Sequence, residues 1–421
     1  MWIDLDRGDM IQELAQAPNT INVKRSTIVY KHMRDPALMR YYYSIKTLNL
    51  ASRLDLSGSS PTDIFIGRFG YPKVFIGPLV PPEFGDTSIL GRPELWRDMP
   101  IDKIVDMRSR LVRGIHLSNI HDIEKGRIEE QVRDLAMAER PAVADMSFSS
   151  RPFMKISLND EVQPFGPSAQ LKRVELYNIK AERHMESLYM DTDAKATTAI
   201  LELYDKGLPT SKIQQGLSAG LFGIKNRRKF VPTRWSITAV DDTLSKTLRE
   251  EIKQNNTMDA VYAYYNVALD NRWLIFFIPG KWQYESIEAW YPNTIWNENG
   301  KDISIYSSYE GYHGRSTYAE IGGCYYAARL AVTEKLKELG RQGTILILRE
   351  VHDGYIMPVG VWNVREHVRQ TLQERPAILH SPGEIWNFIS QRLDISTANW
   401  IANSRILKDM LTQRKIMEYV K

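Results

Sequence analysis

The densest group of residues that could do chemistry lies between positions 225 and 242. Five cations occur within ten residues there, and Phe230 and Trp235 stand among them. Cations neutralise phosphates and aromatic rings stack on bases, so this combination favours contact with a nucleic-acid strand. The alternative is a solvated basic turn that leads into a buried strand. The five cations are Lys225, Arg227, Arg228, Lys229 and Arg234.

Two carboxylates, Asp241 and Asp242, follow a short β-prone run at 235–240. They could bind a metal or exchange protons, and they could equally be N-caps of a helix that runs to about 254. A DNA-processing or nucleotide-dependent enzyme would need them in one pocket with Arg234 and further acids. The further candidate acids are Glu285, Glu310 and Glu350.

A second set of cations lies earlier in the chain. Arg68 falls inside a predicted hairpin, and Arg110 and Arg113 fall in a predicted helix at 100–113. Residues three apart share one face of a helix, so Arg110 and Arg113 could grip a phosphate backbone together. Pairing with internal acids is the open alternative.

The last nine residues, 413–421, carry a spaced set of anchoring side chains. Gln413, Ile416, Tyr419 and Val420 would lie on one side of one or two tight helical turns. The pattern resembles the clamp-binding (PIP) peptide, and it predicts docking to the PCNA sliding clamp. Val420 stands where a second aromatic is usual, so we expect a Kd on the order of micromolar. The alternative is the frayed end of a surface helix.

Composition excludes several classes of protein. Of 421 residues, 43% are hydrophobic and 25% charged, which is typical of globular chains. No apolar run approaches the ~20 residues that span a bilayer, and the acidic start does not resemble a signal peptide. We therefore expect a cytoplasmic, nucleoid-associated protein. The single cysteine, Cys324, excludes sites built from several thiolates, and no zinc or other cofactor is expected.

Turn and periodicity signals predict the elements that would position these residues. A hairpin is expected at 62–80, and two helices at 191–220, capped by Asp191 and Ser211. Later elements are strands at 260–268, 272–278 and 284–291, a helix at about 321–339, a buried strand at 343–351, and two amphipathic helices from about 383.

This order predicts an α+β (or mixed α/β) fold, with mixed sheets, packed helices, a helical C-terminal end and a short extended tail. The predicted divisions are an N-terminal domain at 1–255, a C-terminal domain at 256–408 and a clamp-binding tail at 409–421. In the strand at 284–291, Glu285 and Glu288 would face opposite sides, which weakens a paired-carboxylate interpretation.

Several longer runs resemble the archaeal Nre family of DNA-repair proteins, in particular its NreA type, from about residue 60 to the end. The runs are IGRFGYPKVFIGP (66–78), GDTS (85–88), RSRLVRG (108–114), FGPSA (165–169), DTDAKA (191–196), LSAGLFG (217–223), RRKFVPTRWSITAVDD (227–242), GGCYYAARLAV (322–332) and LREV…MPVGVWNVRE (348–366).

The resemblance implies a role in tolerance of DNA damage and recruitment by PCNA through the C-terminal motif. Many members of the family open with a four-cysteine zinc module, and this chain has no cysteine before Cys324. The resemblance identifies no catalytic residues. We therefore expect a clamp-recruited repair factor that binds DNA; the alternatives are the enzyme described above and an adaptor without DNA binding.

Overall fold

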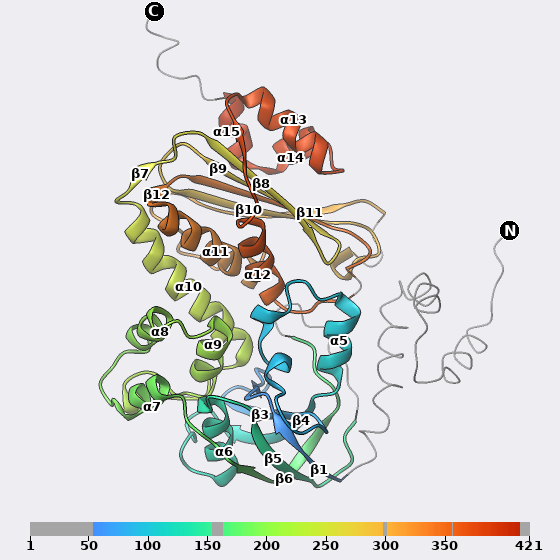
Figure 1. The fold of residues 1–421 in the computed structure, drawn as a ribbon, viewed down its shortest axis with the longest axis vertical. Helices are drawn as coiled ribbons and strands as arrows, with labels where there is room; N and C mark the ends of the chain where they lie inside the picture. The colour runs from blue at the N-terminus through green and yellow to red at the C-terminus, as the bar shows by residue number, and fades with distance from the viewer. Residues whose placement is uncertain (1–53, 154–162, 298–300, 356, 413–421) are drawn as a thin grey trace, which may run out of the picture.

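The computed structural model describes residues 54–153, 163–297, 301–355 and 357–412 (Figure 1). Two six-stranded sheets lie at opposite ends of this structure, with helices between them and beyond the second sheet. The predicted α+β fold with mixed sheets is therefore confirmed. No helix within these ranges is both long and apolar enough to cross a membrane.

The first sheet has the order β1-β5-β6-β4-β3-β2, and its only parallel pair is β4 with β6. The predicted hairpin is confirmed, since Ile64 pairs with Pro78 and Ile66 with Ile76. Gly70 has φ +85° in its turn, a conformation that favours glycine. The strands are β1 (Asp55–Ser60), β2 (Ile64–Ile66), β3 (Lys73–Val80), β4 (Val112–Asn119), β5 (Ala142–Phe148) and β6 (Ser168–Tyr177).

Five shorter helices accompany this sheet among the described residues: α5 (Ile101–Ser109), α6 (Arg127–Met137), α7 (Arg183–Met190), α8 (Ala196–Asp205) and α9 (Thr210–Ser218). Two predicted caps are wrong. Asp191 follows α7 and accepts hydrogen bonds from the amides of Asp193 and Ala194. Ser211 lies inside α9, whose N-cap is Pro209.

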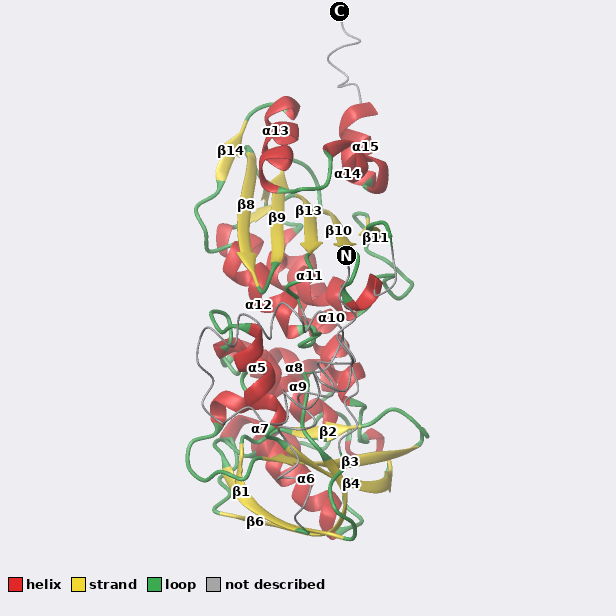
Figure 2. Cartoon of the chain, turned by 90° about the vertical axis from the view of Figure 1, so that its right-hand side faces the viewer, coloured by secondary structure: helices red, strands yellow, loops and turns green. Residues whose placement is uncertain are grey.

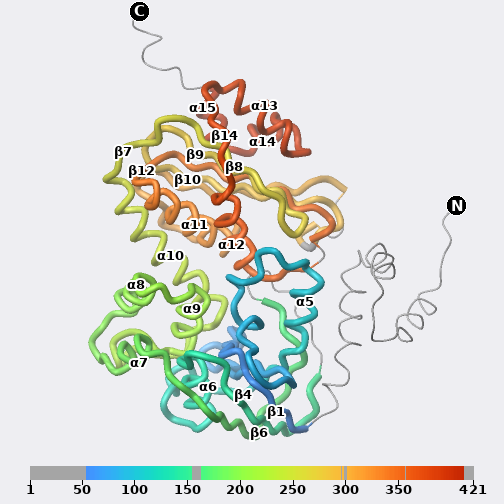
Figure 3. Tube along the Cα trace, viewed as in Figure 1, coloured from blue at the N-terminus to red at the C-terminus, as the bar shows by residue number. Residues whose placement is uncertain are grey.

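The helix α10 (Thr233–Ile252) replaces the strand expected at 235–240. Its 20 residues correspond to a length of about 30 Å. Figure 3 shows it running from the first half of the molecule to the second. Its buried apolar side chains recur at helical spacing, and they belong to the cores of both halves. These side chains are Ile237, Val240, Leu244, Leu248 and Ile252.

Asp241 and Asp242 consequently lie in the middle of a helix, so the prediction that they cap one is wrong. The shared helix face expected for Arg110 and Arg113 is also wrong. The helix α5 ends at Ser109, and β4 begins at Val112, which places Arg113 in a strand.

The second sheet has the order β11-β10-β13-β9-β8-β14, and β10 is parallel to β13. The predicted buried strand is confirmed, because every residue of β13 is buried. The strands are β8 (Val261–Ala268), β9 (Asn271–Ile278), β10 (Gln283–Trp290), β11 (Ser304–Glu310), β13 (Thr344–Val351) and β14 (Ala377–Leu379). A two-stranded ribbon joins β7 (Asn256–Thr257) to β12 (Arg341–Gln342).

Helices cover both faces of the second sheet (Figure 2). The face that carries Tyr284 and Ile345 packs on α11 (Gly323–Leu339) and α12 (Trp362–Thr371). The face that carries Ile287 and Leu346 packs on three C-terminal helices, where the sequence predicted two. These are α13 (Pro382–Arg392), α14 (Thr397–Asn403) and α15 (Arg405–Thr412).

A shared apolar cluster joins the two halves. Trp96, near the start of α5, packs edge-on against Trp362 of α12, with ring centroids 5.0 Å apart. Trp290 and Tyr355 of the second half belong to the same cluster. The boundary that the sequence predicted at 255/256 falls just after α10, a helix that contributes to the cores on both sides of it.

Candidate nucleic-acid interface

The start of α10 lies against the β2–β3 hairpin. Thr233 Oγ1 accepts a hydrogen bond from the backbone amide of Ile66 at 2.9 Å, which ties β2 to the first turn of the helix. The rings of Tyr71 and Trp235 lie 5.3 Å apart, and the amine of Lys229 donates to the Tyr71 hydroxyl at 3.4 Å. The hairpin turn therefore stands beside the N-terminal end of α10.

A pocket of about 390 Å³, called the outer pocket here, opens at this junction. It gathers three candidate nucleic-acid-binding residues, Arg68, Arg234 and Trp235, although Arg68 is distant from the others in sequence. Asp242 lies at its wall and pairs with Arg329 and with Lys246. Tyr318 and Tyr326 complete the aromatic part of the wall.

A second pocket, the inner pocket, has a volume of about 470 Å³ and shares Arg234 and Tyr318 with the outer one. The two pockets adjoin at these shared residues, between the start of α10 and the second sheet, and together they are called the groove here. The inner pocket is lined by aromatic rings and by a few polar groups. These residues include Trp290, Trp296, Tyr306, Tyr355, Glu288, Arg349, Cys324 and Asn363.

Four aromatic side chains of the groove are about half exposed. Large aromatic residues normally bury most of their surface, so such exposure along one groove indicates a surface that binds a ligand. The exposed fractions are 45% for Trp235, 48% for Trp296, 49% for Tyr306 and 57% for Tyr318.

A buried ion pair forms the polar wall of the inner pocket. Arg349 Nη1 donates to Glu288 Oε1 at 2.7 Å, and both side chains are almost fully buried. The guanidinium lies over the ring of Trp273 at 4.7 Å and over that of Trp290 at 5.2 Å. These contacts fix the arginine and compensate its charge.

Asn363 is fully buried at the base of the inner pocket. One end of its side-chain amide lies 2.5 Å from Nδ1 of His367, and the amide nitrogen has no partner among the described residues. Burial lowers the pKa of His367 to about 4, so this ring is neutral at physiological pH. Asn363 therefore keeps one unsatisfied end of its amide, and this end is itself buried.

The five cations of the basic block do not form one exposed strip, as nucleic-acid contact along the whole block would require. Arg228 is buried, and its guanidinium donates to the carbonyls of Gly223 at 2.7 Å and of Tyr189 at 2.6 Å. It holds the loop before α10 in place. Lys225 and Arg227 are exposed at a separate site, and only Arg234 of the block lines the groove.

The other predicted cations lie away from the groove. Arg110 pairs with Glu83. Arg113 donates to the Phe75 carbonyl at 3.1 Å, and its guanidinium lies over the Phe65 ring at 4.2 Å. Burial lowers the pKa of Arg113 to about 9. Arg110 is therefore held in a half-exposed ion pair and Arg113 in an intramolecular contact, and the two do not form a shared surface for phosphates.

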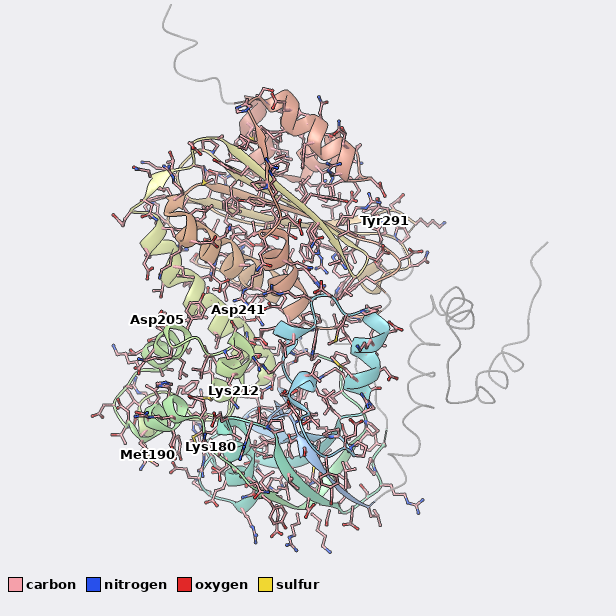
Figure 4. The ribbon with its side chains drawn as sticks, viewed as in Figure 1. Lys180, Met190, Asp205, Lys212, Asp241 and Tyr291 are labelled. Atoms are coloured by element: carbon pink, nitrogen blue, oxygen red, sulfur yellow. The ribbon has the colours of Figure 1, made fainter. Side chains whose placement is uncertain are left out.

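The carboxylates proposed for an enzyme do not converge in one cleft. Asp241, marked in Figure 4 between the two halves, accepts hydrogen bonds from Arg365 at 2.9 Å and Gln214 at 3.0 Å. Burial raises its pKa to about 6, against the attraction of Arg365. Glu310 pairs with Arg329 at 2.7 Å. Each acid is thus committed to an internal arginine.

The remaining two acids face the opposite side of the second sheet. Glu285 accepts hydrogen bonds from Ser404 Oγ at 2.7 Å and from the amides of Arg405 and Ile406 at 2.8 and 2.9 Å, so it caps α15. Glu350 accepts from the amide of Ile395 at 2.8 Å. The prediction that Glu285 and Glu288 face opposite sides is confirmed, because Glu288 points to Arg349.

One group of side chains has the spacing of metal ligands. Glu350, His352 and Asp394 bring one ligand atom each within 4.8 Å of one another. Arg272 already lies 2.5 Å from Asp394 and 3.8 Å from Glu350. Because this guanidinium compensates both carboxylates, the group does not favour a cation.

A larger cavity of about 910 Å³ lies beside α9, and Lys212 lines it (Figure 4). The lysine amine donates to the Ala138 carbonyl at 2.5 Å and to the Thr62 hydroxyl at 3.3 Å. Burial lowers the pKa of Lys212 to about 7. Its contacts tie α9 to the end of α6, which is a structural role.

Sequence reasoning missed most of the inner pocket. Tyr306, Tyr318 and Trp296 come from an edge strand and from connections, and no local pattern marks them as neighbours of Arg234. The clamp-binding candidates Gln413, Ile416, Tyr419 and Val420 lie outside the described residues.

Two family models match most of the chain. The family model for archaeal Nre, N-terminal, matches residues 32–297, and that for archaeal Nre, C-terminal, matches residues 310–419. The division between them falls inside the second sheet, because β8, β9 and β10 lie within the first match and β13 and β14 within the second, while β11 lies between the two matches except for Glu310.

Curated relatives cover most of the chain. The DNA repair protein NreB of Archaeoglobus fulgidus is 38% identical over 367 residues, which cover 87% of this chain and 92% of the relative. The DNA repair protein NreA of Haloferax volcanii is 35% identical, with 81% and 84% covered, and NreA of Archaeoglobus fulgidus is 31% identical, with 85% and 90% covered. No solved structure matches the chain. With two family models and three relatives aligned along most of its length, the chain belongs to the archaeal Nre family.

Proposed function

We propose that this protein is a DNA-repair factor that binds a single-stranded or locally opened DNA strand in the groove. The observation that carries the proposal is the gathering of four half-exposed aromatic rings with Arg68 and Arg234. Relatives that are named DNA repair proteins support the repair role.

The chemistry of the groove suits an unpaired strand better than a duplex. Stacking on an aromatic ring requires an accessible base face, and each stacked base contributes about 1–3 kcal/mol. Apart from Arg349, which is buried and paired with Glu288, two arginines line the groove, which is few for a protein that grips a duplex backbone. If each contacts one phosphate, log K falls with log salt with a slope of about −1.4 on single strands.

Fluorescence anisotropy with a labelled oligothymidine would test this proposal. Trp235→Ala and Tyr318→Ala should each weaken binding by about five- to one-hundredfold. Phe84→Ala, which removes an exposed ring outside the groove, is the matched control and should bind like the wild type. Unchanged affinity in both groove variants, with folding intact, would show that DNA does not bind there.

We also propose that the tail at 413–421 recruits the protein to PCNA. The spacing of Gln413, Ile416, Tyr419 and Val420 supports this. The last described helix, α15, packs on the face of the second sheet that lies away from α11 and α12, whereas the groove opens on the α11 and α12 side. Clamp docking would therefore leave the groove accessible, and a tether to the clamp would compensate for weak DNA affinity.

Calorimetric titration with PCNA would test the tail. Wild-type protein should bind with a Kd on the order of micromolar, and Tyr419→Ala should abolish measurable binding. Lys415→Ala, between the anchoring positions, is the matched control and should bind normally. Binding that survives removal of 413–421 would refute the tail proposal, and clamp binding without DNA binding would identify an adaptor.

A further inference from the structure

We propose that the inner pocket holds one unstacked nucleobase of the bound strand between its aromatic walls. This inference rests on the proposed binding of DNA in the groove. It adds a substrate class, namely a flipped or unpaired base, to a surface that would otherwise only stack on a strand.

The dimensions and walls of the pocket fit a planar ring. A volume of about 470 Å³ lies within the range of small-ligand sites and is ample for a base. Trp296, Tyr306 and Tyr318 supply half-exposed ring surface, and Trp290 and Tyr355 supply buried ring surface. Proteins that bind an extrahelical base hold it between aromatic and apolar side chains in this way.

The charged side chains of the inner pocket exclude a phosphate as the group that is bound deep inside it. Arg349 is already paired with Glu288 and enclosed by the rings of Trp273 and Trp290. Arg234 lines both pockets, where the strand backbone would pass. This distribution suits an uncharged base inside and a phosphate at the junction of the two pockets.

Cys324 provides a direct test, because it is the only cysteine of the chain, lines the inner pocket and is partly exposed. The rate of its alkylation by iodoacetamide would be measured with full-length protein, alone and with a saturating oligothymidine of about 15 nucleotides. A base in the pocket should slow alkylation roughly tenfold when about nine-tenths of the protein is bound. Anisotropy would report the bound fraction independently.

The matched probe is a strand of equal length and charge in which abasic residues replace every nucleotide. Bound to the same fraction, it should leave the alkylation rate unchanged, because it has no base to insert. Tyr306→Ala, which removes a half-exposed ring of the inner pocket, should lower the affinity for oligothymidine about fivefold and leave that for the abasic strand unaltered.

The outcomes separate the two proposals. If oligothymidine binds and both strands affect Cys324 equally, the base-pocket inference is wrong while DNA binding stands. If neither strand binds, both proposals fail. Protection by oligothymidine alone supports the base pocket.

Discussion

Each of the two sheets carries ion pairs that can be compared, one group exposed and the other buried. On the first sheet, Glu175 of β6 pairs with Arg173 and Arg127, whose side chains are 61% and 72% exposed. On the second sheet, the pair of Arg349 with Glu288 is almost fully buried, and that of Arg329 with Glu310 is completely so. Water therefore screens the charges around Glu175 and is excluded from these two pairs of the second sheet.

This difference shows in which part of the molecule charged groups lose their hydration. A buried pair seldom stabilises more than well-packed apolar residues would, because both ions lose their hydration. The second sheet nevertheless buries such pairs beside the groove, where the pair of Glu288 with Arg349 forms its polar wall. We interpret these pairs as part of the binding surface rather than as a source of stability.

The largest expected effect comes from breaking one of the buried pairs. Glu288→Gln leaves the guanidinium of Arg349 buried without its countercharge, and it should lower the free energy of unfolding by about 3–5 kcal/mol. Urea denaturation would measure the loss. The double variant Glu288→Leu, Arg349→Met should recover much of that stability, and failure to recover it would mean that the pair stabilises the fold.

The next effect concerns pH. The pKa of His367 is lowered from its ordinary value of 6.5 to about 4, because burial disfavours the charged ring. Between these values the unfolded chain binds a proton that the folded chain does not, so folding loses stability as pH falls from 6.5 towards 4. The loss is about 1.4 kcal/mol per pH unit, or about 3 kcal/mol in total.

Asp241 acts in the opposite direction, since its pKa is raised by burial to about 6 and the folded chain holds a proton there that the unfolded chain releases. The contribution of His367 to the pH dependence of stability is therefore measured as the difference between the wild type and a variant that lacks this histidine. As the pH is lowered, the urea midpoint of the His367→Gln variant should decrease less steeply than that of the wild type. The exposed control His121→Gln should keep the wild-type profile, and identical profiles for all three proteins would contradict the assignment.

A smaller effect is expected at the cap of α15. Glu285→Ala removes the acceptor of the amides of Arg405 and Ile406, and it should cost about 1–3 kcal/mol. Hydrogen exchange should accelerate in α15 and remain unchanged in α11. Equal acceleration in both helices would indicate global rather than local loss of stability.

The smallest effect should come from the first sheet. Glu175→Gln removes the acid shared by Arg127 and Arg173, and we expect no measurable change in the urea midpoint, since exposed pairs contribute little. At a higher salt concentration, the urea midpoint of the variant should likewise equal that of the wild type. A clear destabilisation would show that the exposure of an ion pair does not distinguish the contributions of the two sheets to stability.

Much of the architecture could be predicted from local pattern. The hairpin, the helix after residue 320 and the buried strand β13 each have a strong signal within a short window. The error at α10 has a definite cause. Ile237, Thr238 and Val240 are β-branched and favour a strand locally, whereas the spacing of Ile237, Val240, Leu244 and Leu248 is helical. The helical period becomes visible only when the window extends past Asp241.

The groove was predictable only in part. Arg68, Arg234 and Trp235 carry recognisable chemistry, and the structure brings them together. Arg228 is also a cation of the basic block, but its guanidinium donates to backbone carbonyls. No local sequence pattern reveals that this side chain is buried. Tyr306 and Tyr318 reach the groove through the packing of the second half against α10, so their role depends on tertiary contacts.

Strands from the earlier and the later part of the chain are intermixed in the second sheet, and this order restricts how a gene of this family could be divided during evolution. A break between residues 297 and 304 would separate β10 from both of its neighbours, β11 and β13. Each product would expose unpaired strand edges, which favour aggregation. The two matched segments should therefore be inherited together, and an artificially split gene should yield function only when both halves are expressed in the same cell.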